Sequence, residues 1–166
     1  MMTQALFISL LQNTAILISA VLLYDYFWIK GDVTKRWYDK VLAGLSISLI
    51  GSLLMLTPWS ASEGLFFDTR SILLSISGVF LGPLPTIIAS LLLALYRFIL
   101  GGPGMWMGVT VILTAGSIGI AWGLFIRRRT KRIGWLQLWL IGLNVHLVML
   151  LCTLLLPSAL FLPTLK

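Results

Sequence analysis

The stretch that decides the fold is Ser71–Gly104, which reads SILLSISGVFLGPLPTIIASLLLALYRFILGGPG. It is almost entirely apolar, and about 20 consecutive apolar residues suffice for a helix to span a bilayer. Pro83 and Pro85 interrupt it, and a proline inside a helix removes a backbone donor and clashes with the preceding turn. The stretch therefore predicts two short helices joined by a tight turn. Short segments broken by glycine and proline often line a binding cavity at membrane depth.

The composition places the whole chain in a membrane. Of the 166 residues, 59% are hydrophobic and 10% are charged, and the mean hydropathy is +1.03. Soluble domains carry about 25% charged residues. The length suits a single domain over residues 1–166, and the fold class predicted is an all-α, polytopic transmembrane bundle of about six helices. Besides the broken hairpin up to Leu100, the apolar runs are Ala5–Phe27, Val41–Met55, Trp106–Ile126 and Trp135–Leu156. The polar patch Ser60–Gly64 reads as a connection between spans.

Two basic clusters set the orientation. The net charge is +7, and the positive residues gather in the Lys30–Lys40 and Arg127–Arg132 loops, both between apolar spans. Cytoplasmic loops carry such an excess of lysine and arginine. We therefore expect both loops in the cytoplasm and no nucleic-acid partner. An even number of crossings then places both termini, Arg70 and Arg97 on the outer side. The positive-inside bias does not explain these two arginines.

Arg97 and Arg70 are the candidate ligand-binding residues. A guanidinium at membrane depth costs a few kcal/mol or more, so it needs a partner, a wet cavity or an anion. Because the two arginines bracket one hairpin, they can converge on a single carboxylate or phosphate, which a guanidinium grips with two parallel hydrogen bonds. Arg70 has a simpler alternative, in which it extends to the lipid head groups. Asp68 can likewise N-cap the helix that begins near Ser71.

The glycines after Arg97 extend this candidate site. Gly101 and Gly102 can let backbone N–H groups approach an anion, ahead of a helix that begins near Met105, although a plain turn explains them equally well. Thr110 can hydrogen-bond a ligand, or it can bond back to a carbonyl of its own helix. The remaining glycines of interest favour close helix packing in the membrane: Gly78, Gly82, Gly108, Gly116 and Gly119.

The other polar residues point to structure. Asn13 lies within the first span, where a buried amide usually bonds a neighbouring helix, and His146 favours a packing or interfacial role. No Ser/His/Asp set, carboxylate pair or metal-ligand spacing appears, so we expect no catalytic residue, metal or cofactor. Cys152 is the only cysteine, which excludes an intrachain disulfide. Three tryptophans lie near span ends as interface anchors: Trp59, Trp106 and Trp135.

Several of these motifs together resemble a known family, the LytS-type five-transmembrane receptor domain of bacterial histidine kinases and diguanylate cyclases. The resemblance covers roughly Ala5–Pro163, and it is carried by Asn13, Asp68-Thr69-Arg70, Gly78–Pro83, Tyr96–Gly104 and Gly108. It implies a bacterial cytoplasmic-membrane receptor that senses an external or membrane-borne signal and drives a cytoplasmic output module. Together with the two arginines, it leads us to expect a small anionic ligand on the outer half. Membrane lipid and a second copy of the chain are the other partners that we expect.

The resemblance also assigns roles. Some members are associated with small carboxylates such as pyruvate, and the residues that carry over are Arg70 and Arg97, with Asp68 and the glycines as scaffold. Gly108 and Val111 offer no side-chain donor for a carboxylate, so Thr110 is the substitute we expect. With Lys166 on the outer side, the chain reads as a sensor without a final helix or an output domain, and not as an enzyme.

Two other functions stay open on the sequence. The substrate-capture subunit of a vitamin-type transporter has a similar length and helices punctuated by glycine and proline. A small-residue docking surface on the first helix would favour it, and Ala15–Ala20 offers little of one. A membrane enzyme acting on lipid phosphates is the third reading, and the lack of catalytic acids or histidines on the outer face weighs against it.

Overall fold

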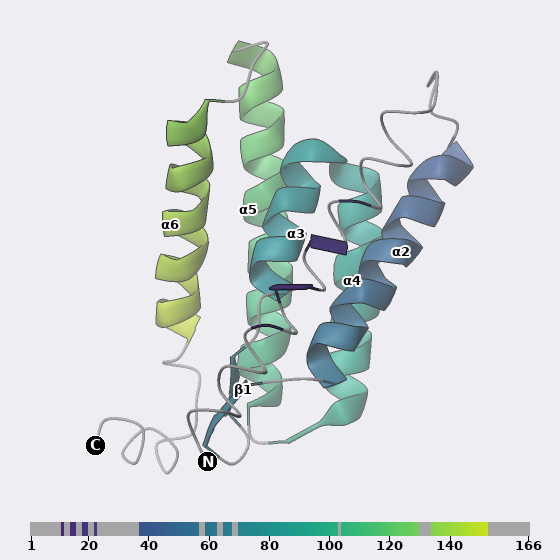
Figure 1. Ribbon diagram of the computed structural model, residues 1–166, viewed down its shortest axis with the longest axis vertical. Coiled ribbons are helices and arrows are strands. Elements are labelled where there is room, and N and C mark those ends of the chain that lie inside the picture. The colour runs from purple at the N-terminus through teal and green to yellow at the C-terminus, as the bar shows by residue number, and fades with distance from the viewer. Residues whose placement is uncertain are drawn as a thin grey trace.

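The computed structural model shows a bundle of helices along one common direction, with α6 and α2 at opposite sides and α3, α4 and α5 between them (Figure 1). The described residues are 37–56, 59–62, 65–67, 70–102, 104–129 and 134–152, together with Leu11, Thr14, Ala15, Ile18, Ser19 and Leu22. The elements are α2 (Trp37–Leu56), β1 (Trp59–Ser62), β2 (Leu65–Phe67), α3 (Arg70–Phe80), α4 (Pro83–Leu100), α5 (Met105–Arg129) and α6 (Trp135–Cys152).

Four of the five described helices are long and apolar enough to cross a membrane. They are Trp37–Met55, Pro83–Leu100, Met105–Arg128 and Trp135–Cys152. The fifth, α3, has 11 residues, or roughly 16 Å at 1.5 Å per residue, and is too short to cross. The prediction of an all-α membrane bundle is confirmed. Most of the first predicted span, Ala5–Phe27, lies outside the described residues, and its six described residues are helical.

The broken hairpin has the predicted form. The N–H groups of Leu81 and Gly82 both bond the carbonyl of Ser77, at 2.8 and 3.2 Å, which ends α3. Gly82 has φ of 92°, a conformation that only glycine adopts without strain. Pro83 then opens α4, where its missing N–H costs nothing. Gly82 therefore makes the turn, and the prediction that it serves helix packing is wrong.

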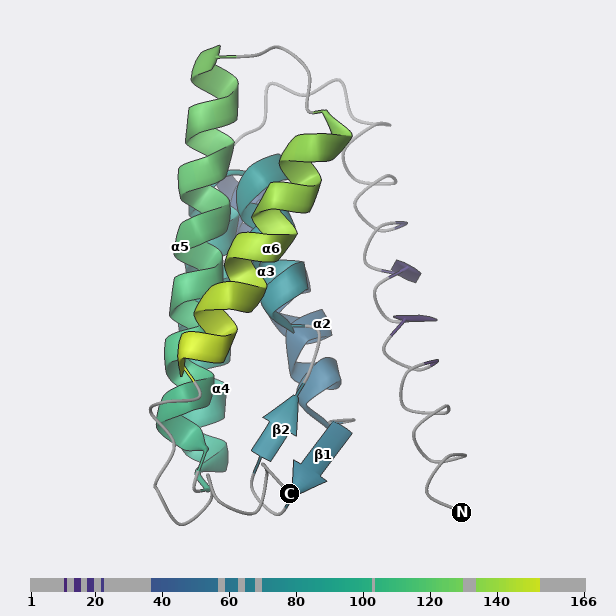
Figure 2. The same cartoon turned by 90° about the vertical axis from the view of Figure 1, so that its left-hand side faces the viewer.

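A short β-hairpin lies where the sequence predicted only a polar connection. β1 and β2 are antiparallel, with Trp59 opposite Phe67 and Ser60 opposite Phe66. Figure 2 shows the pair between the end of α2 and the start of α3. Aromatic residues favour strands, and both strands carry them at the ends of the polar patch. The polar residues between them obscure this short pattern in the sequence.

Glycines bring α3 and α5 into backbone contact. A Cβ added to Gly78 would meet the backbone of Gly119 and Ile120, and one added to Gly119 would meet the backbone of Ser75. A Cβ on Gly123 would lie 2.7 Å from the carbonyl oxygen of Gly78. Small residues let membrane helices approach this closely. The predicted packing role of Gly78 and Gly119 is confirmed.

The outer surface is apolar, as a lipid-facing surface must be. Exposed leucines cover α2, α4 and α6, whereas Leu54, Leu74, Leu93 and Ile112 are almost fully buried between the helices. Trp106 and Trp135, at the first turns of α5 and α6, are 64% and 78% exposed, as interface anchors require. The side chain of Trp59 lies outside the described part.

Candidate functional site

The bundle has two ends of different character. The start of α2, the α3–α4 turn and the end of α5 lie at the upper end in Figure 1. We call this the basic end, because Lys40, Arg127 and Arg128 belong to it. The end of α4 and the start of α5 meet at the other end, around Gly101–Gly104, which we call the glycine-loop end. Arg97 lies in the last turn of α4, so it belongs to the glycine-loop end, as the sequence predicted.

Arg97 is buried at the end of its helix. Its side chain is only 4% exposed, and its Nη1 donates to the carbonyl oxygen of Gly101 at 2.8 Å. The N–H of Gly101 bonds back to the carbonyls of Arg97 and Phe98, at 3.3 and 3.2 Å. This C-cap needs the positive φ of 65° that Gly101 adopts. The amide of Gly101 thus caps α4, while its carbonyl accepts a hydrogen bond from the guanidinium. That Gly101 contributes to a ligand site stays a prediction.

Gly108 on α5 makes room for the Arg97 side chain. A Cβ at this position would lie 2.6 Å from Nε of Arg97 and 3.1 Å from its Cγ. The arginine stem therefore lies directly across the α5 backbone. Gly108 was predicted to permit close packing, and that is confirmed, with an arginine side chain as the group that approaches. Sequence reasoning did not connect these two residues, although both belong to the motifs of the family resemblance.

Arg70 is the first residue of α3 and is also buried, at 6% exposed. Two contacts define how α3 lies against α5: Ser75 is beside Gly119 and Val79 is beside Gly123. In both contacts the residue numbers differ by 44, and the two helices are parallel. The same difference places Arg70 level with Thr114. Arg97 lies level with Gly108, six residues away on α5, or about 9 Å along its axis. Both arginines are on the side of the hairpin away from its turn. That they share one anion stays a prediction.

The hairpin supplies the buried polar side chains of the described residues, which are Arg70, Ser71, Ser75, Ser77, Thr86, Ser90 and Arg97. Near the turn, the hydroxyls of Ser77 and Thr86 are 3.1 Å apart, and Thr86 donates to the carbonyl of Gly82 at 2.9 Å. Deeper in, Ser90 lies against Gly116, whose missing Cβ leaves room for the hydroxyl. A polar seam therefore runs through the apolar bundle along α3 and α4.

The other predicted residues have local roles in the structure. The hydroxyl of Thr110 donates to the carbonyl of Trp106 at 2.8 Å, so it bonds back to its own helix. The carbonyl of Gly102 accepts the N–H of Met105 at 3.0 Å, which starts the turn into α5. Asp68 and Asn13 lie outside the described residues. That Thr110 and Gly102 contact a ligand stays a prediction.

His146 makes a local contact on α6. The Nδ1 of His146 lies 2.8 Å from the carbonyl of Gly142 in an exposed position on α6. Within the described ranges, no group of three or more His, Cys, Asp or Glu side chains gathers as a metal site would require. Cys152 is a free, buried thiol. The chemistry of the described site is therefore that of a buried cation beside hydroxyl and carbonyl groups.

Comparison with known proteins identifies the family of the chain. The model of the family described as 5TMR of 5TMR-LYT matches residues 21–165. Asn13 precedes the match, whereas both arginines and the glycine loop fall within it. Neither the curated proteins nor the solved structures contain a significant match. The matched residues are those of a sensor domain and include no kinase or cyclase domain. With its four apolar spans, the chain is a multi-pass membrane protein and belongs to the 5TMR-LYT family of membrane sensor domains.

Proposed function

We propose that this sensor domain binds a small anion, such as a carboxylate, at its glycine-loop end and signals its presence to a cytoplasmic histidine kinase or diguanylate cyclase. Its location would be the bacterial cytoplasmic membrane, with the glycine-loop end outside. The observation that carries the proposal is the burial of Arg97, a permanent cation only 4% exposed inside an apolar bundle.

The physical reason is the cost of that charge. A buried ion is stable only when its geometry and hydrogen bonds compensate its lost hydration. The carbonyl of Gly101 accepts one hydrogen bond from Arg97. A carboxylate matches the planar guanidinium with two parallel bonds, so it is a ligand chemistry that suits this buried cation. Arg70 begins α3 and lies about 9 Å from the level of Arg97, measured along the axis of α5. It adds a second positive charge to the same half of the bundle.

The site is built to hold its cation in place before a ligand arrives. Gly108 removes the side chain that would displace Arg97, and Gly101 turns its carbonyl back toward the guanidinium. A cation already in position loses less side-chain entropy when it binds a partner. Family membership supports a sensor over the substrate-capture subunit of a vitamin-type transporter.

The test is a binding titration on the purified chain in lipid nanodiscs. Small carboxylates are the probes, with pyruvate first. Arg97→Ala should weaken binding about 10- to 150-fold, because a hydrogen bond to a charged group contributes about 1.5–3 kcal/mol. Arg97→Lys should restore little, since an ammonium lacks the planar fork.

Arg128→Ala is the matched control. It removes an exposed arginine at the basic end, so it changes the net charge equally and should leave the affinity unchanged. Equal binding by Arg97→Ala and by the wild-type chain would overturn the proposal. Equal weakening by Arg128→Ala and Arg97→Ala would show a diffuse charge effect and would overturn it too.

A further inference from the structure

Most of the positive charge of the chain lies in two clusters of the sequence. Nine of its 12 lysines and arginines lie within Lys30–Lys40 and Arg127–Arg132. Of these, Arg127 and Arg128 end α5 and are exposed. Orientation in the membrane requires only that such charges be present in the loop. It does not require any one of them to be held in a fixed position.

Arg127 makes a specific contact with the α3–α4 turn. Its Nη2 donates to the carbonyl of Phe80, the last residue of α3, at 3.2 Å. A Cβ added to Gly82 would lie 3.3 and 3.4 Å from its two terminal nitrogens, so the guanidinium lies against the α3–α4 turn. Within the described part of the chain, this hydrogen bond engages one nitrogen of Arg127, and the side chain remains exposed.

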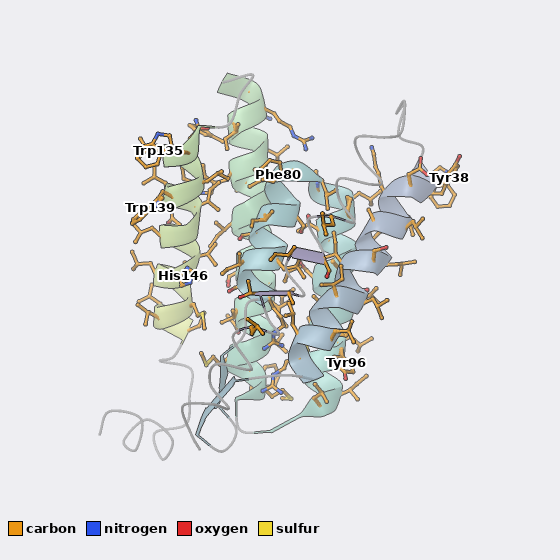
Figure 3. All side chains as sticks on the ribbon, viewed as in Figure 1. Tyr38, Phe80, Tyr96, Trp135, Trp139 and His146 are labelled. Carbon is orange, nitrogen blue, oxygen red and sulfur yellow. The ribbon has the colours of Figure 1, made fainter. Side chains whose placement is uncertain are left out.

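Aromatic side chains mark this level as the membrane interface. Figure 3 shows Phe80, Trp135 and Trp139 toward the same end of the bundle. Trp135 and Trp139 are 78% and 69% exposed, and tryptophan concentrates at the level of the lipid head groups. On α5 itself, Trp122 and Phe125 form an edge-to-face pair with centroids 6.0 Å apart. The guanidinium of Arg127 therefore lies where lipid phosphates are found.

We propose that the α3–α4 turn and the end of α5 form a binding site for the head group of an anionic phospholipid, with Arg127 as its principal contact. A guanidinium can bond a carbonyl through one nitrogen and present its remaining N–H groups to a phosphate. Arg128 adds a second positive charge. Leu124, 44% exposed, lies one turn deeper on the same side of α5, so an acyl chain has an apolar surface to follow.

Two sources could supply an anion to this site. A free phosphate ion has the same chemistry as a head group, and the apolar surface beside the site is what favours the lipid.

The experiment measures lipid retention by the purified chain. Protein in phosphatidylcholine nanodiscs is titrated with phosphatidylglycerol, and bound lipid is counted by native mass spectrometry. Arg127→Gln should weaken retention of phosphatidylglycerol about tenfold or more, as the loss of one charge-assisted contact predicts. Arg128→Gln removes the same charge one residue away and should weaken it clearly less. Arg127→Lys keeps the charge and should fall between wild type and Arg127→Gln, which keeps the test valid if the glutamine variant folds poorly.

Two outcomes would overturn the proposal. Equal losses in Arg127→Gln and Arg128→Gln would mean that the loop attracts anionic lipid only through its total charge. Inorganic phosphate, added alone, should not raise the thermal midpoint of the protein. A rise as large as that given by phosphatidylglycerol would assign the site to a soluble phosphate.

Discussion

Replacing Gly108 by alanine tests the geometry of Arg97 without touching its charge. The new methyl group would lie 2.6 Å from Nε and 3.1 Å from Cγ of Arg97, whereas favourable contacts between heavy atoms lie at about 3.5–4.0 Å. The arginine must therefore move by roughly 1 Å. Its Nη1 now donates to the carbonyl of Gly101 at 2.8 Å, and a movement of this size takes that bond to or beyond its useful limit.

The expected effect is on binding more than on folding. The clash falls on a flexible side chain, so the helices need not separate. Losing a hydrogen bond from a charged donor costs about 1.5–3 kcal/mol. We therefore expect the affinity for a small carboxylate to weaken about 10- to 150-fold. The affinity is measured by calorimetry in nanodiscs. The Nε resonance of Arg97, followed by NMR in arginine-labelled protein, reports the change in its surroundings without any ligand.

Two other glycines serve as controls. Gly142 has nothing within 4 Å of an added Cβ, so Gly142→Ala should bind normally and gain about 0.5–1 kcal/mol from its higher helix propensity. In Gly119→Ala the methyl meets the backbone of Ser75, which cannot move alone, so this variant should lose thermal stability. The reasoning fails if Gly108→Ala binds like wild type, or if it loses as much thermal stability as Gly119→Ala.

Two further predictions concern the hairpin and the topology. Thr86→Val keeps the shape of the side chain but removes its hydrogen bonds to Ser77 and Gly82, so unfolding in mixed micelles should show a loss of about 1–2 kcal/mol. In intact cells, an impermeant maleimide should label Ser62→Cys and miss Thr130→Cys, because we expect the Arg127–Arg132 loop in the cytoplasm. Strong labelling of the latter would contradict the orientation.

The helices and the hairpin turn were predictable because strong local signals specify them. A long apolar run forms a helix in lipid, where each backbone polar group needs an internal partner, and Gly82 with Pro83 allows only a turn. The helix ends were less predictable. α2 begins at Trp37 and α5 extends to Arg129, beyond the apolar runs, because charged residues can continue a helix past the hydrocarbon.

The contacts between helices were not predictable from one sequence. Glycines that suit packing are spread along α5, and nothing in their spacing says that Gly119 meets α3 whereas Gly108 meets Arg97. Those partners depend on the register of the helices, which the tertiary fold sets. The same reason explains Gly101. Its sequence suggested an amide open to an anion, but a helix that ends there uses that amide for its own cap.

The short helix α3 determines where one of the two buried arginines lies. Because α3 has only 11 residues, it begins partway through the bundle, level with Thr114. Arg70, its first residue, therefore lies in the same half of the bundle as Arg97, and both have under a tenth of their surface exposed. Arg97 lies in the last turn of α4, where the partial negative charge of a helix C-terminus favours a cation. At the basic end, by contrast, Arg127 and Arg128 are exposed and can be neutralised by lipid and solvent. The anion that we propose would have to enter the bundle to reach these arginines, which is why the proposal concerns a small ligand rather than a membrane surface.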